Sequence, residues 1–175
     1  MKFEKVSKER FRLDLVNSFI KQGKTEEEAK YFASSIATEN LDDIDIPKRS
    51  TAASAGYDFQ MPFTITIHPG QTIVIPTGIK AKLDSDKVLM IAPRSSIGIK
   101  KHLKLANTQA YIDADYYNNI SNEGHILIAL TSENDDNVTL EYKDKIAQGI
   151  IIQYFTTDDD DCTDVRTGGI GSTGN

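Results

Sequence analysis

The first 42 residues carry apolar side chains at the spacing of a helix. Two runs each keep these side chains on one face: Phe11, Leu15, Val16, Phe19 and Ile20, then Ala29, Phe32, Ala33, Ile36 and Ala37. Gly23 between the runs is a common residue at helix C-termini, and Thr25 with Glu28 fits a capping box. The pattern predicts a helical hairpin over about 7–22 and 26–41, within an N-terminal unit at 1–44.

The apolar stripe of this hairpin needs a cover, because an amphipathic helix is stabilised mainly by packing of its apolar face. One alternative is that the hairpin docks on the rest of its own chain. The other is that it binds a partner protein or a second copy of the chain. Both alternatives are open at this point.

From Asp45 onward the apolar period changes to two, which is typical of β-strands. The alternating segments are FTITIHPG, QTIVIPTGIKAKL, KVLMIAP, HILIALTS, NVTLEY and IAQGIIIQYF. Short strands separated by turn signals such as PTG and ENDDN favour a β-barrel or jelly roll. We therefore expect a mainly β core over residues 45–155. Residues 156–175 follow as an acidic linker and a flexible glycine-rich segment, with metal binding by the acidic run as an alternative to a solvated linker.

Composition and charge restrict the partners. Hydrophobic residues make up 39% of the 175, enough for a core, and the formal net charge is -6 with no basic tract. Bulk binding to nucleic acid depends on Lys and Arg against phosphate, so it is not expected. No segment has the apolar pattern of a signal peptide or membrane span. Cys162 is the only cysteine, and the absence of a disulfide fits the cytoplasm.

Residues 106–119, ANTQAYIDADYYNN, interrupt the alternating pattern. Asp113 and Asp115 are two positions apart, and residues at this spacing on a strand share a face. Tyr116 follows directly, and Asn107 stands upstream. The stretch gathers two acids, an aromatic ring and an amide, which makes it a candidate site. A purely structural role is the simpler interpretation for Asp115.

Four other segments carry polar groups at distinctive places. APRSSIGIK, at 92–100, puts Arg94 and two hydroxyls just past a strand, which suits phosphate. SAGYDF leads through small residues to Asp58, and KDKIAQ brings Gln148 into an otherwise apolar strand. In RTGGIGSTG, at 166–174, glycines let backbone amides approach a ligand closely. Each segment alone is a weak signal.

In this order, AGYDF, PRSSIG, NTQAYIDADYY, KDKIAQ and RTGGIGSTG resemble the five motifs of the trimeric dUTPase family. The resemblance runs from about Pro47 to Gly174, and DADYYNN with NEGHI is similar to the form in Gram-positive bacteria and their phages. The fourth motif departs from the family, because its leading glycine is Tyr142 or Lys143 here. Ile170 stands where the family has an aromatic residue. The helical hairpin lies outside the family pattern.

The resemblance implies that a β-hairpin of the third motif binds deoxyuridine. Asp113 matches the general base that activates water for attack on the α-phosphorus. Tyr116 matches the ring that packs on the deoxyribose and leaves no space for a 2′-hydroxyl. Asn107 matches the amide that reads the uracil edge, together with backbone groups near Ala110 and Ile112.

The other motifs are implied to hold the triphosphate and Mg²⁺. Asp58 matches a residue that orients the ion through its water shell, in keeping with the waters that Mg²⁺ retains on phosphates. The remaining substrate contacts implied by the resemblance are Arg94, Ser95, Ser96 and Gln148, and a C-terminal lid with Arg166, Gly169, Ile170, Gly171, Ser172 and Thr173.

These matches imply a homotrimeric dUTP pyrophosphatase whose active sites are shared between chains. Such an enzyme yields dUMP and pyrophosphate, limits uracil incorporation into DNA and supplies dUMP for dTMP synthesis. It would act in the cytoplasm, or in the host cytoplasm if phage-encoded. A dCTP deaminase of the same fold is one alternative, although deaminases need a glutamate proton shuttle and lack the tyrosine of DADYY. Another is a phage-type dUTPase that also binds a regulatory protein through the hairpin.

Overall fold

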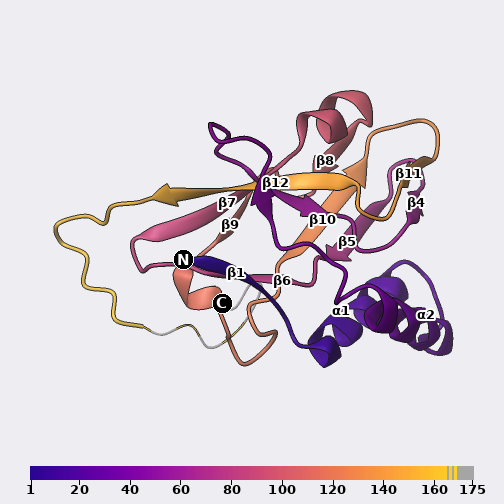
Figure 1. The fold of residues 1–175 in the computed structure, drawn as a ribbon, viewed down its shortest axis with the longest axis horizontal. Helices are drawn as coiled ribbons and strands as arrows, with labels where there is room; N and C mark the ends of the chain where they lie inside the picture. Colours follow the sequence, from indigo (N-terminus) through magenta and orange to yellow (C-terminus); the bar gives the residue numbers. More distant parts are fainter. Residues whose placement is uncertain (165, 167, 169–175) are drawn as a thin grey trace.

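The chain folds mainly as β-structure beside two N-terminal helices (Figure 1). The structure is a computed structural model that describes residues 1–164, 166 and 168. The helices are α1, Lys8–Lys21, and α2, Glu26–Glu39. The strands in these residues are β1 (Lys2–Lys5), β2 (Lys48–Arg49), β3 (Tyr57–Gln60), β4 (Ile65–Ile67), β5 (Thr72–Pro76), β6 (Ile79–Lys82), β7 (Lys87–Pro93), β8 (Leu103–Leu105), β9 (Ala110–Ile112), β10 (Leu127–Ser132), β11 (Val138–Leu140) and β12 (Lys145–Gln153). A π-helical turn at Ser96–Lys100 and a 3-10 turn at Ala114–Tyr116 connect some of them.

Both predicted helices are present, and each begins at a side-chain cap. At the start of α1 the Ser7 hydroxyl accepts a hydrogen bond from the Arg10 amide at 3.1 Å. At the start of α2, Thr25 Oγ1 accepts from the Glu28 amide at 3.3 Å, while the Glu28 carboxylate accepts from the Thr25 amide at 2.9 Å. Gly23 between the helices has a φ of +90°, which glycine adopts without strain. The hairpin prediction is confirmed to within two residues at each helix end.

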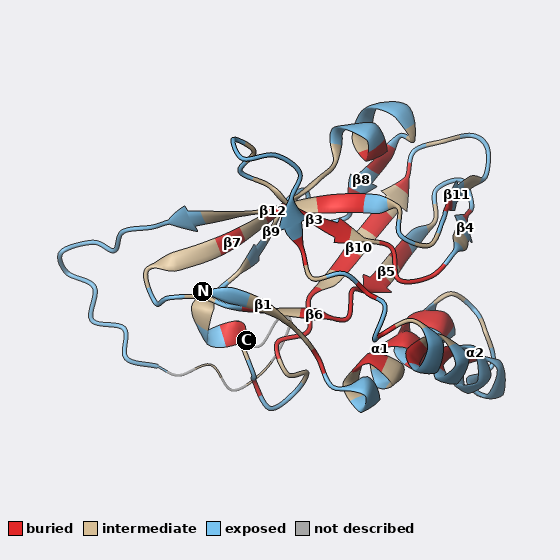
Figure 2. Cartoon of the chain, in the orientation of Figure 1, coloured by how far each residue is buried: buried red, intermediate tan, exposed pale blue. Residues whose placement is uncertain are grey.

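The hairpin docks on the β-sheets of its own chain. Phe11 and Leu15 of α1 are fully buried in the same hydrophobic core as the strands. Figure 2 shows the buried part of α1 in red. The Ser18 hydroxyl of α1 donates to the carbonyl oxygen of Val74 in β5 at 2.5 Å. The buried side chains of α2 are Ala29, Ala33 and Ala37. Small residues at this spacing let α2 pack closely on α1, so the inner face of the hairpin is covered within the chain.

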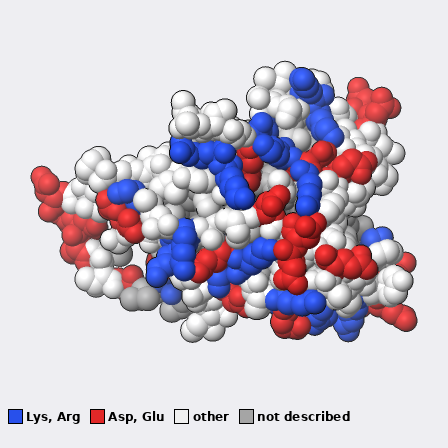
Figure 3. Space-filling model, in the orientation of Figure 1, with Lys and Arg blue, Asp and Glu red and all other residues white. Residues whose placement is uncertain are grey.

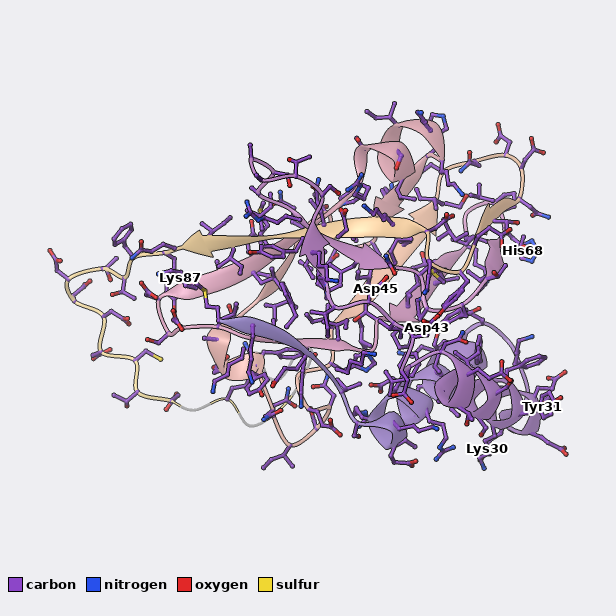
Figure 4. The ribbon with its side chains drawn as sticks, viewed as in Figure 1. Lys30, Tyr31, Asp43, Asp45, His68 and Lys87 are labelled. Atoms are coloured by element: carbon purple, nitrogen blue, oxygen red, sulfur yellow. The ribbon has the colours of Figure 1, made fainter. Side chains whose placement is uncertain are left out.

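The outer face of α2 stays exposed. Lys30 and Tyr31 project from this helix away from the sheets (Figure 4), and Tyr31 is 73% exposed. Phe32, a member of the predicted apolar stripe, is 40% exposed because the alanines make the contact with α1. Helical spacing thus identified the stripe but overestimated its buried width.

The strands of the described residues form four antiparallel sheets. Their strand orders are β1-β6, β5-β10-β8, β11-β4 and β2-β3-β12-β7-β9. The arrangement resembles a jelly roll, and no sheet closes into a barrel within the described residues. The mainly β prediction is confirmed, with the jelly roll rather than the closed barrel as its correct form.

The strand predictions succeed where alternation is uninterrupted. KVLMIAP coincides with β7, Lys87–Pro93. The segment QTIVIPTGIKAKL divides into β5 and β6 at its predicted turn signal PTG, where Gly78 has a φ of +76°. The sequence did not predict β1, because its KFEK residues are mostly charged. Pairing with β6, from Lys2 opposite Lys82 to Lys5 opposite Ile79, gives this strand its conformation.

The acidic segment after β12 is exposed throughout residues 154–164. Figure 3 shows acidic side chains gathered where this segment runs, while both signs of charge are interspersed over the rest of the visible face. Across the described residues, no three His, Cys, Asp or Glu side chains gather closely enough to hold a metal. The same part of the chain contains no helix with the length and apolar character needed to cross a membrane.

Candidate active site

Three strands of the largest sheet bring the first, second and fourth motifs together. Gln148 of β12 pairs with Asp58 of β3 on one side and with Ala92 of β7 on the other. Arg94 lies two residues beyond Ala92, and its guanidinium donates to Asp58 Oδ1. We call Asp58, Arg94, Gln148 and Lys145 the phosphate cluster, after the ligand that its cations suit.

Asp58 is held as an anion at the centre of this cluster. Its residue is only 6% exposed. Its Oδ2 accepts from the Ser50 hydroxyl at 2.7 Å and from Lys145 Nζ at 2.8 Å. Burial raises the pKa of Asp58, but hydrogen bonds from Lys145, Ser50 and Arg94 outweigh it, so the pKa lies below its ordinary value. The cluster therefore contains one ionised carboxylate between two cations.

A β-bulge brings Lys145 to this cluster. Lys145 pairs with Gln60 and Ala147 with Phe59, so Ile146 is an extra residue in β12. Because of the bulge, Lys145 and Gln148 reach the same face, although strict alternation places residues three apart on opposite faces. Alternation along the sequence therefore does not identify Lys145 as a neighbour of Asp58.

The glycine of AGYDF lies against Gln148 of the fourth motif. A Cβ on Gly56 would lie 2.5 Å from Oε1 and 3.1 Å from Cβ of Gln148. The glycine thus makes room for the side chain of Gln148. Lys143 stands where the fourth motif usually has its leading glycine, because its φ of +66° is a conformation that favours glycine. Its ammonium pairs with Asp43 at 2.9 Å.

A cavity of about 210 Å³ opens beside the phosphate cluster. Its lining residues are Asp45, Ile46, Lys48, Arg49, Ser50, Asp58, Gln60 and Lys145. Gln60 Oε1 is buried there and finds no hydrogen-bond partner among the described residues. Ser95 and Ser96 stand exposed at the start of the π-helical turn that follows Arg94. The cavity lining and the two exposed serines thus add polar groups to those of the phosphate cluster.

The third motif forms a separate group at the end of β9. Asp113 and Asp115 are both exposed, and both bind one guanidinium: Arg166 donates to Asp113 Oδ2 at 2.7 Å and to Asp115 Oδ1 at 2.8 Å. The same guanidinium lies 5.7 Å from the centre of the Tyr116 ring. The two acids thus reach one cation, but not from a strand as expected, because β9 ends at Ile112 and Asp115 lies in the 3-10 turn. We call Asp113, Tyr116 and Arg166 the hydrolytic cluster, after the role that the resemblance implies for Asp113.

The remaining predicted residues of the third motif precede this cluster in the chain. Asn107 is exposed in the turn between β8 and β9, while Ala110 and Ile112 of β9 are half-buried. The expected β-hairpin needs a correction, because β8 pairs with β10 and β9 with β7. The connection 106–109 thus joins two different sheets, with Thr108 at a φ of +64°.

The two clusters do not meet within one chain. Ile112, next to Asp113, pairs with Leu89, whereas Arg94 lies five residues further along the chain from Leu89. At roughly 3.3 Å per residue, five residues separate Arg94 from the Leu89–Ile112 pair by about 17 Å along the strand direction. Strands β12 and β7 also lie between β3 and β9. Arg166 sits with the hydrolytic cluster. The predicted contacts at Gly169, Ile170, Gly171, Ser172 and Thr173 lie outside the described residues.

Comparisons with known proteins agree with this arrangement of motifs. A family model for dUTPase matches residues 42–174. The chain belongs to the dUTPase family. A deoxyuridine 5'-triphosphate nucleotidohydrolase from Lactococcus lactis is 43% identical over 133 residues, which cover 75% of this chain and 89% of that protein. One from Shewanella baltica is 33% identical over 159 residues, covering 86% and 98%.

Solved dUTPase structures share the fold. The crystal structure from Streptococcus mutans has a TM-score of 0.62 at 40% identity and covers 69% of this chain and 91% of its own. A variant of the dUTPase from phage phi11 of Staphylococcus aureus, described for its structural Mg(II) ion, has a TM-score of 0.59 at 20% identity, with 70% and 92% covered. The dUTPase match begins at residue 42, so α1 and α2 lie outside it.

Proposed function

We propose that this enzyme hydrolyses dUTP to dUMP and pyrophosphate in the cytoplasm, with Asp113 as general base, in active sites shared between the chains of a homotrimer. The observation that carries the shared sites is the separation of about 17 Å between Arg94 and Ile112, the neighbour of Asp113, estimated from strand geometry. A closed ring of identical chains can bring the phosphate cluster of one chain to the hydrolytic cluster of the next.

The phosphate cluster supplies charge for the triphosphate. Arg94 offers a guanidinium, whose planar fork suits phosphate oxygens, and Gln148 offers an amide on the same face. Ser95 and Ser96 extend this surface with exposed hydroxyls. In the free chain Asp58 binds the cations that phosphate would engage. Substrate binding therefore exchanges one anion for another at Arg94, without creating an unpaired charge.

Mg²⁺ fits the phosphate cluster as an ion that enters with the substrate. The cluster offers one carboxylate, Asp58, and Gln60 Oε1 adds a buried oxygen without a partner among the described residues. Mg²⁺ commonly binds with one or two carboxylates, several waters and the phosphates of its substrate. Asp58 would hold the ion through water, and the ion would offset the negative charge of the triphosphate.

The hydrolytic cluster supplies the base and the sugar pocket. Asp113 is exposed and can reach water, as a general base must. In the free chain Arg166 occupies this carboxylate and lies over the Tyr116 ring. Substrate entry would displace the guanidinium toward the phosphates and free both groups. Tyr116 would then pack on the deoxyribose, and Asn107 would read the uracil edge.

One assay tests the reaction. Pyrophosphate release should be fast with dUTP and slow with dCTP, dTTP and UTP measured side by side. Ammonia release from dCTP would instead identify a deaminase. Equal rates with dUTP and dTTP would show that the pocket does not select uracil.

Mixing two inactive variants tests the shared sites. Arg94→Ala damages the phosphate cluster, and Asp113→Asn damages the hydrolytic cluster. If each site combines two chains, random 1:1 trimers should contain about one quarter intact sites. Activity should therefore reappear after the variants are unfolded and refolded together. Each variant refolded alone is the control, and no recovery in the mixture would place each site within one chain.

A second role in binding a regulatory protein has one supporting observation, the exposed aromatic pair Tyr31 and Phe32 on α2. Deleting the hairpin cannot test this role, because α1 supplies core residues. Tyr31→Ser should instead abolish capture of a regulator and leave dUTP hydrolysis unchanged. Capture equal to that of the unaltered chain would exclude this surface as the contact.

A further inference from the structure

A continuous set of hydrogen bonds connects α1 to the segment that follows Tyr116. Arg10 donates to Asp14 from Nε at 3.0 Å and from a terminal nitrogen at 2.7 Å. Asp14 Oδ2 lies 2.6 Å from His125 Nδ1. His125 Nε2 accepts from the Gly78 amide at 2.8 Å. Since Nε2 is an acceptor, the neutral ring carries its proton on Nδ1 and donates it to Asp14.

The set continues from His125 to Tyr116. The Tyr116 hydroxyl donates to the backbone carbonyl of His125 at 3.1 Å and accepts from the Asn122 amide at 2.6 Å. His125 is fully buried and Tyr116 only 6% exposed. Gly124 closes the loop tightly: a Cβ there would lie 2.6 Å from the Tyr116 carbonyl oxygen. The hydroxyl end of the ring is therefore fixed by the same segment that Asp14 holds.

Two further contacts bind this segment to the start of α1. Glu123 accepts from the Ser7 amide at 2.9 Å and from the Ser7 hydroxyl at 2.6 Å. Arg10 also donates to the carbonyl oxygen of Ser121 at 2.9 Å. Ser7 and Arg10, like Asp14, precede residue 42, where the match to the dUTPase model begins. A helix outside the family pattern thus holds the loop that follows the third motif.

We infer that α1 positions the Tyr116 ring, and that Asp14, acting through His125, is a positioning residue for the discrimination between deoxyribose and ribose. The inference rests on the proposed packing of Tyr116 against the sugar. A ring that is held at its hydroxyl end cannot tilt to admit a 2′-hydroxyl. Loosening that end relaxes the discrimination even though no atom of Asp14 touches substrate.

The test compares kcat/KM for UTP and dUTP in the intact trimer. Asp14→Asn keeps the shape of the side chain but weakens its bonds to Arg10 and His125. It should raise the UTP to dUTP ratio roughly tenfold, the equivalent of about 1.4 kcal/mol. Glu9→Gln, which breaks an exposed pair with Arg12 on the same helix, is the matched control and should leave the ratio unchanged.

A double-mutant cycle separates positioning from general destabilisation. Tyr116→Phe keeps the ring and removes the hydroxyl, so it should raise the ratio as Asp14→Asn does. If Asp14 acts through that hydroxyl, adding Asp14→Asn to Tyr116→Phe should change the ratio no further. Full additivity of the two changes would overturn the inference.

Two other outcomes keep the proposals distinct. If Tyr116→Ala leaves the ratio unchanged, the proposed role of Tyr116 is wrong. If Tyr116→Ala raises the ratio and Asp14→Asn does not, the role of Tyr116 stands and the positioning role of α1 falls. Should Asp14→Asn fail to form a trimer, Arg10→Gln is the milder variant. It should raise the ratio in the same direction, and an unchanged ratio would overturn the inference equally.

Discussion

Replacing Asp58 with asparagine tests whether the phosphate cluster is held together by one anion. The substitution keeps the side-chain shape but removes the charge between Arg94 and Lys145. It also replaces one of the two acceptor oxygens with an NH₂ group. In the unaltered chain Oδ1 accepts from Arg94, and Oδ2 accepts from both Ser50 and Lys145. The variant thus leaves two cations close together without a counter-ion.

The expected loss of stability depends on how deeply Asp58 and its two cationic partners are buried. Removing one partner from a buried ion pair typically costs about 3–5 kcal/mol. The Asp58 side chain is 5% exposed, but those of Arg94 and Lys145 are 30% and 44% exposed and can recover water. We therefore expect a loss of about 2–3 kcal/mol, below the range for a fully buried pair. For a chain of this size that corresponds to a fall in Tm of roughly 4–12 °C.

Thermal unfolding at fixed protein concentration measures this loss, since Tm of an oligomer depends on concentration. Glu133→Gln is the matched control, because Glu133 pairs with Lys104 at 2.5 Å while both side chains are more than half exposed. That variant should lose about 0–1 kcal/mol. If both variants lose the same stability, burial of Asp58 does not strengthen its pairing and the reasoning fails.

The pH dependence gives a second check with a definite sign. The pKa of Asp58 is lowered in the folded chain, so the folded state binds fewer protons at this group than the unfolded state. The stabilisation is complete above the unfolded pKa, near 4, and is lost as pH falls through the lower folded pKa. The Tm difference between the unaltered chain and Asp58→Asn should therefore shrink below about pH 4. A difference that grows on acidification would contradict the ionised state of Asp58.

Four further predictions address the reaction. Asp113→Asn should lower dUTP turnover by about 10²–10⁴-fold, the usual contribution of a general base, while Asp115→Asn keeps most of it; steady-state rates in the opposite order would assign the base to Asp115. Gly56→Ala should raise KM for dUTP, because the new Cβ would lie 2.5 Å from the present position of Gln148 Oε1; an unchanged KM would show that this amide does not hold substrate. EDTA should suppress pyrophosphate release and added Mg²⁺ should restore it, whereas full activity in EDTA would remove the metal from the reaction. Deleting residues 165–175 should cripple turnover with little change in Tm, and a full rate in the truncated enzyme would exclude a lid.

Features set by nearby residues were predictable from the sequence. The capping box of Thr25 and Glu28 depends on a four-residue pattern, and Lys87–Pro93 alternates without interruption. Features set by distant residues were not. The extra residue Ile146 in β12 is recognised only against its partner strand, so Lys145 could not be placed beside Asp58. The separation of β8 from β9 likewise depends on which strands they pair with.

The candidate site likewise combines features set by nearby residues with features set by distant ones. Asp113, Asp58 and Arg94 came from motifs that are local in sequence, and the structure places them at two clusters. The contact between Asp14 and His125 joins positions 111 apart. Neither residue carries a local signal, because a lone acid on a helix and a lone histidine before a strand are both common. Their link is visible only once α1 has been placed against the loop.

The contacts of α1 determine when this helix can dock during folding. Ser7 meets Glu123, 116 positions later, and Val6 bonds to Gly78. The helix itself can form within microseconds and can pack on α2 early, but its contacts with the strands and with the segment after Tyr116 must wait until those residues have left the ribosome. Contacts this distant in sequence slow folding and prolong the exposure of apolar surface. Docking of α1 is therefore a late step, and the sugar pocket should acquire its final shape only when the rest of the fold is complete.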